Sequence, residues 1–129
     1  MELKGLSLVK AVLRSISRKQ AQDIIVLDMR GLSAIADFFI ICTGNSSVHL
    51  KALADAMEID LKKRKRNSTG PYKIHGYNSE TWILYDYIDV VVHIFKDDAR
   101  GYYAIEKLWS DAIRLDTADI FKQRKQNSS

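Results

Sequence analysis

The chain has 129 residues, of which 47% are hydrophobic, one is proline and six are glycines, so it has the size and composition of one folded domain and not of a disordered protein. No apolar run reaches the roughly 18 residues of a membrane span, and no basic start followed by an apolar stretch indicates a signal peptide. The single cysteine, Cys42, cannot form an internal disulfide and lies in an apolar run, so we expect it to be a small buried side chain. Together these features predict a cytoplasmic protein.

The net charge of +4 is unevenly distributed along the chain. From His75 to Asp119, nine acidic residues stand against four basic ones, so the remainder carries the positive charge. The acidic part suits a basic partner. Much of the positive charge lies in a tail, 122–129, that we expect to be loose and outside the single domain 1–121, and in a basic run made of Lys62, Lys63, Arg64, Lys65 and Arg66.

The first half of the chain predicts a helix, two strands and a second helix. Apolar residues recur at three- and four-residue spacing from Leu6 to Ile16, which predicts an amphipathic helix of about fourteen residues. The β-branched run 24–28 and the apolar run 38–43 predict buried strands. The side-chain oxygens of residues 45–47 can cap the helix that follows, and the apolar face of that helix leads into the basic run.

The second half predicts three further strands and a last helix. The strands are expected at 72–74, 81–85 and 90–95, with the turn 86–89 joining the last two into a hairpin. The last helix is expected at 97–112, because its first residues are acidic and its apolar residues form one stripe.

These elements predict an α/β fold with a mixed five-stranded sheet flanked by helices. The runs 24–28, 38–43 and 90–95 are apolar at every parity. Such strands are typical of the centre of a sheet that is covered on both faces, so we expect helices on both sides.

Nucleotidyl transfer is the enzymatic reaction for which the sequence offers most. The segment 43–46 (Thr-Gly-Asn-Ser) lies between a strand and a helix and could present backbone amides to a phosphate. Such a site also needs two or three carboxylates on magnesium. Asp86 and Asp89 are three residues apart across a turn, and neither Asp28 nor Asp37 has an acidic partner two residues away. The sequence therefore contains half of such a site, and we expect no catalysis.

The three histidines do not add a catalytic or metal site. His49 follows the predicted helix cap, His75 precedes a glycine, and His93 lies in the strand 90–95, where we expect a hydrogen-bonded structural histidine. No serine has the Gly-x-Ser-x-Gly surroundings of a hydrolase nucleophile, and no metal-ligand spacing is present. We expect no metal and no cofactor.

Three stretches together resemble the Iojap, or ribosome-silencing factor, family. They are 36–52, 82–95 and 100–112, within a region of resemblance from about Leu6 to Ala112. The run 90–95 (Val-Val-Val-His-Ile-Phe) with the Leu-Trp pair downstream is the most specific part. The family usually has glycine where Ile88 stands, so we expect a turn that does not need a positive φ at that position.

The resemblance implies a fold similar to the nucleotidyltransferases but without their catalytic acids. It also implies a binding function and not an enzymatic one: docking on the large ribosomal subunit through ribosomal protein uL-fourteen, which blocks joining of the small subunit and represses translation. The family commonly forms homodimers when free. An RNA-binding ribosome assembly factor and a nucleotidyltransferase-like enzyme remain the alternatives.

For such a factor we expect the acidic half to orient the basic partner and a few aromatic side chains to anchor it. Which face of the strand 81–85 is exposed stays open, because that strand is apolar at both parities, and Trp82 could also be core. We expect Tyr102 and Trp109 in the core. The basic run 62–66 is either a solvated helix end or a non-specific contact with ribosomal RNA. The expected partner-binding residues are Trp82, Tyr103, Tyr77, Leu84, Asp86 and Asp89.

Overall fold

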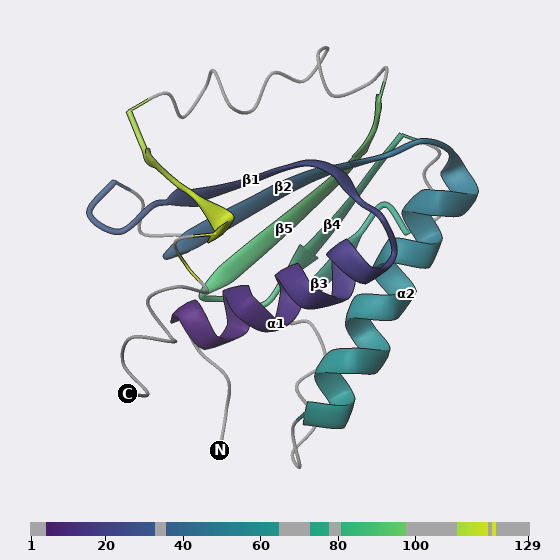
Figure 1. The fold of residues 1–129 in the computed structure, drawn as a ribbon, viewed down its shortest axis with the longest axis horizontal. Coiled ribbons are helices and arrows are strands. Elements are labelled where there is room, and N and C mark those ends of the chain that lie inside the picture. Colours follow the sequence, from purple (N-terminus) through teal and green to yellow (C-terminus); the bar gives the residue numbers. More distant parts are fainter. Residues whose placement is uncertain are drawn as a thin grey trace.

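The computed structural model describes residues 5–32, 36–64, 73–77, 81–97, 111–118 and 120 (Figure 1). Two long helices lie within these ranges, α1 (Gly5–Arg18) and α2 (Ser47–Arg64). Its strands are β1 (Gln22–Asp28), β2 (Phe38–Gly44), β3 (Lys73–His75), β4 (Trp82–Asp86), β5 (Val90–Lys96) and β6 (Ile113–Leu115). The predicted last helix, 97–112, falls almost wholly outside the described residues, as does the tail 122–129.

The strands form one mixed sheet in the order β3-β4-β5-β2-β1-β6. β2 and β5 run parallel at its centre, and the other neighbouring pairs are antiparallel. The mixed α/β sheet and the five predicted strands are confirmed, but the count of five is wrong. β6 adds a sixth strand at the edge of β1, where Ile113 pairs with Asp28. Because β6 has three residues and no buried side chain, it carries no periodic signal in the sequence.

Both described helices lie on the same face of the sheet (Figure 1). α2 contacts α1, β2, β4 and β5, and α1 contacts β2 and β5. The predicted apolar face of α2 is confirmed, because Leu50, Leu53, Met57 and Leu61 are all buried there. The prediction of helices on both faces is not met within the part of the chain that the structure describes.

The two central strands are buried along their whole length except at Lys96. Their side chains alternate between the helix-covered face and the opposite face, as the pleat of a strand requires. Phe38, Ile40 and Cys42 pack toward the helices, so the expected burial of Cys42 is confirmed. Phe39 and Ile41 belong to a second apolar cluster on the opposite face.

Local hydrogen bonds set the ends of the helices. At the end of α1, the amides of Gln20 and Ala21 donate to the carbonyl oxygens of Ser17 and Ile16, at 2.9 Å each. This is the Schellman pattern, and Gln20 takes the left-handed conformation (φ 65°) that it needs. At the start of α2, the Ser46 hydroxyl accepts from the amide of His49 at 3.1 Å, which confirms the predicted cap.

Candidate protein-binding surface

β4 has one side fully in the core and one side half-exposed. Ile83 and Tyr85 are buried toward the helices, whereas Trp82 and Leu84 are partly buried and pack against the cluster on the opposite face. The structure therefore answers the question that the sequence left open. The exposed side of β4 faces away from α1 and α2.

Trp82 lies in a group of four rings on that opposite face. Its indole is nearly parallel to Phe95, with ring centroids 5.7 Å apart, and nearly parallel to His93, at 6.1 Å. Phe39 meets His93 edge-on at 5.1 Å. Aromatic groups at these separations attract one another and restrict each other's rotation. We call the partly exposed pair Trp82 and Leu84, together with the rings of Phe95, His93 and Phe39 beside them, the aromatic platform.

His93 is the polar member of the platform. It is only 6% exposed, and neither ring nitrogen has a hydrogen-bond partner among the described residues. The prediction that His93 forms structural hydrogen bonds is therefore wrong. Burial disfavours the charged imidazolium and lowers the pKa of His93 to about 4, so the ring is neutral near pH 7.

Tyr77 has different neighbours from Trp82. Its hydroxyl donates to the Asp55 carboxylate on α2 at 2.7 Å, and Lys51 lies 5.7 Å from its ring centroid. The hydrogen bond to Asp55 raises the pKa of Tyr77. Tyr77 is 37% exposed but is held by the helix that covers the other face of the sheet. The structure does not place it on the aromatic platform.

Asp86 is the last residue of β4, roughly 13 Å along the strand from Trp82, and Asp89 lies in the turn that follows. The Asp86 carboxylate accepts a hydrogen bond from the amide of Ile88 at 2.8 Å. Ile88 itself has φ 75°, so the expectation of a turn without positive φ is wrong. The five predicted contact residues that the structure describes thus do not form one cluster.

Neither Tyr103 nor the side chains of the basic run can be placed. Tyr103 lies outside the described residues, together with Tyr102 and Trp109. The basic run begins on α2, but the described side chains stop before Lys62, and Lys65 and Arg66 lie outside the described residues altogether.

The loop that could have held a phosphate is occupied by the chain's own side chains. The amide of Asn45 donates to Nδ1 of His49 at 3.0 Å. Nε2 of the same ring lies 2.8 Å from the carbonyl oxygen of Lys19, so this nitrogen carries the proton and donates it. A Cβ at Gly44 would come within 3.0 Å of Leu50, so there is little space. His49 therefore connects the end of α1 to this loop and uses an amide that a phosphate would need.

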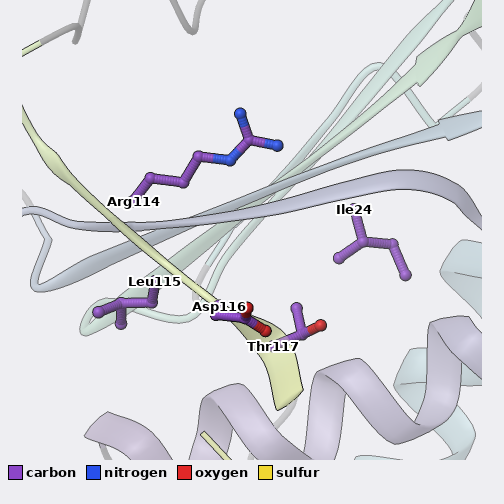
Figure 2. Close-up of a pocket in the computed structure, with 5 residues that line it drawn as sticks. All are labelled: Ile24, Arg114, Leu115, Asp116 and Thr117. Carbon is purple, nitrogen blue, oxygen red and sulfur yellow. The ribbon is translucent and has the colours of Figure 1, made fainter. Parts of the chain in front are cut away.

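A pocket that sequence reasoning did not find opens where β6 ends beside β1 (Figure 2). Its volume is about 410 Å³, and it is lined by Ile24, Arg114, Leu115, Asp116 and Thr117. The Asp116 carboxylate accepts from the amide of Ala118 at 2.8 Å and so stabilises the turn that follows. Among the described residues, no group of three or more histidine, cysteine or acidic side chains could hold a metal ion. No helix in the described ranges is long and apolar enough to cross a membrane.

The chain is similar to several known proteins over most of its length. It is 41% identical over 110 residues to "Ribosomal silencing factor RsfS" of Bacillus subtilis, covering 85% of this chain and 91% of that protein. It is 29% identical over 96 residues to "Mitochondrial assembly of ribosomal large subunit protein 1" of Mus musculus, covering 74% and 42%.

Solved structures of similar proteins have the same fold as this chain. A crystal structure from Chromobacterium violaceum superposes with a TM-score of 0.77 at 33% identity, covering 85% of this chain and 88% of the other. A second, from Bacillus halodurans, has a TM-score of 0.75 at 32% identity, covering 87% and 99%. The model of the family described as "Ribosomal silencing factor during starvation" matches residues 3–129. The chain therefore belongs to the RsfS family of ribosomal silencing factors, as the resemblance to Iojap proteins indicated.

Proposed function

We propose that this protein binds the large ribosomal subunit through ribosomal protein uL-fourteen and sterically prevents the small subunit from joining, which represses translation. The observation that carries the proposal is the match of residues 3–129 to a family of silencing factors. A further relative is named for assembly of the large ribosomal subunit, which favours that subunit as the partner.

The aromatic platform is the surface that we propose for this contact. Trp82 presents a large ring whose orientation is fixed by Phe95 and His93, so little side-chain entropy remains to be lost on binding. Leu84 lies two residues along the same side of β4 and extends the apolar area. Protein interfaces are anchored by a few such central aromatic groups, and Tyr103 remains part of the proposal.

The proposed mechanism makes and breaks no bond. His49 fills the loop that a nucleotidyltransferase would use for phosphate, and Asp28 forms an ion pair with Arg30 at 2.7 Å. Asp86 is engaged by the Ile88 amide. Occupation of a ribosomal surface requires only shape and charge. We further propose a cytoplasmic location, a homodimer when free, and a non-specific contact between the basic run and ribosomal RNA.

Sedimentation with purified ribosomal subunits tests this proposal. The protein is expected to comigrate with large subunits, not with small ones, and to reduce the yield of joined ribosomes when both are mixed. Full subunit joining at saturating protein would refute the proposal.

The two alternatives give different results in the same preparation. A nucleotidyltransferase would bind nucleotide in a magnesium-dependent way. An assembly factor that recognises RNA would bind deproteinised ribosomal RNA with an affinity that falls steeply with salt.

A further inference from the structure

The tip of the β4–β5 hairpin holds an isoleucine in a conformation that isoleucine rarely adopts. Ile88 has φ 75°, in the left-handed region. There the Cβ of any L-residue crowds the backbone, and a β-branched side chain crowds it most. Such a position favours glycine or asparagine, so the isoleucine side chain stands where the backbone geometry disfavours it.

The surrounding hydrogen bonds hold this turn in place from both sides. The amide of Tyr87 donates to the carbonyl oxygen of Val90 at 2.9 Å, and the Tyr87 side chain is buried. The Asp89 carbonyl oxygen accepts from the amides of Asp37 and Phe38, at 2.8 and 3.1 Å. The amide of Ile88 itself donates to the Asp86 carboxylate. Ile88 therefore cannot leave the left-handed region without breaking these bonds.

Ile88 gains little from burial in return. Its side chain is 57% exposed and belongs to neither apolar cluster of the sheet. Among the described residues, Ile88 therefore has backbone strain with little compensating apolar contact. Strain retained at a rigid, exposed position points to a contact with another molecule.

The charge around the tip selects the kind of molecule. Asp86 and Asp89 flank Ile88, and Asp37 is exposed on the loop bonded to the turn. Asp28, the next carboxylate at this end of the sheet, is neutralised by Arg30, which also lies over the Phe38 ring. A nucleic-acid backbone would be repelled by these carboxylates, whereas a lysine- or arginine-bearing protein surface would be attracted.

We infer that Ile88 is an anchoring contact for a basic protein partner, which receives its side chain in an apolar depression bordered by cationic groups. This contact is separate from the aromatic platform, because it lies at the opposite end of β4. The inference rests on the proposed function, since it takes a protein of the large ribosomal subunit as that partner.

Ile88→Gly tests the inference because its two expected effects have opposite signs. Glycine adopts φ 75° freely, so the variant is expected to unfold at a higher denaturant concentration than the wild type. Its affinity for large subunits, measured by a cosedimentation titration, is expected to fall about tenfold. Ile88→Val keeps a β-branched apolar side chain and is expected to bind within about twofold of the wild type.

Ile59→Ala is the matched control, because Ile59 is an isoleucine of similar exposure (54%) on α2. It is expected to leave the affinity unchanged. If Ile88→Gly binds as tightly as the wild type, the inference is overturned and the proposed function stands. If the wild type itself does not bind large subunits, the proposed function fails and the inference fails with it.

A photoreactive amino acid at position 88 identifies the class of partner. On purified large subunits, illumination is expected to give an adduct with a ribosomal protein. An adduct with ribosomal RNA instead would overturn the assignment to a basic protein surface.

Discussion

The two faces of the sheet differ in what their side chains do. On the helix-covered face, α1 and α2 supply Leu13, Ile16 and Leu53 to a cluster that is closed to solvent. On the opposite face, Phe39, His93 and Phe95 are buried. The partly exposed Trp82 and Leu84 pack against this group. One face is therefore closed by helices, whereas the other carries the partly exposed surface that we propose for a partner.

The sharpest test of this division is a cavity on the helix-covered face. Leu53 of α2 is 0% exposed, so Leu53→Ala is expected to lower the free energy of unfolding by about 2–5 kcal/mol. Urea denaturation measures the change, and Ile59→Ala on the exposed side of the same helix should change it by less than about 0.5 kcal/mol. Similar losses for the two variants would contradict the assigned faces.

The opposite face should respond to acid because of His93. An unfolded imidazole binds a proton below pH 6.5, whereas in the folded protein the pKa is about 4. Stability is therefore complete above pH 6.5 and falls as the pH drops toward 4, by up to about 3 kcal/mol. Urea denaturation at several pH values should show this slope, and His93→Phe should remove that part of it. An unchanged slope in His93→Phe would show that other groups cause it.

Removing the Trp82 ring from the aromatic platform, the surface that we propose for the partner, should lower the affinity for large subunits. Trp82→Ala is expected to weaken binding to large subunits by about 1–3 kcal/mol, while Trp82→Phe keeps the stacking on Phe95 and loses less. The cosedimentation titration measures both, with far-ultraviolet circular dichroism to confirm the fold. Unchanged affinity in a folded Trp82→Ala protein would remove this residue from the proposed anchors.

The smallest expected effect concerns the cap that starts α2. Ser46→Ala removes the acceptor for the His49 amide and is expected to destabilise the protein by about 1 kcal/mol. Ser46→Asn restores an acceptor at the same position and should recover most of the loss in a denaturation experiment. Equal stability of Ser46→Ala and the wild type would show that another group satisfies this amide.

The sequence predicted what depends on neighbours along the chain. The runs 38–43 and 90–95 are long and apolar, so their burial at the centre of the sheet followed from composition alone. The cap at Ser46 followed from the residue type in front of a helical pattern. The place of the loop 43–46 between a strand and a helix also followed from the sequence, although its occupation by His49 depends on the end of α1, far away in the chain.

What could not be predicted depends on long-range packing. β4 is apolar on both sides, so only its position beside β5 and under α2 decides that Trp82 is half-exposed and Tyr85 buried. Tyr77 has a partner, Asp55, that no spacing rule identifies. The left-handed Ile88 contradicts the local preference of its residue type and is imposed by the bonds around the turn.

The parallel pairing of β2 with β5 has a consequence for how the protein is made. β2 ends at Gly44 and β5 begins at Val90, so the two central strands meet only after the whole crossover between them has been synthesised. Closing so long a loop is slow, because the entropy of the loop is lost before the contacts between the two strands stabilise the chain. A nascent chain that ends before β5 therefore lacks the central strand pair, so this sheet cannot form until β5 has been synthesised.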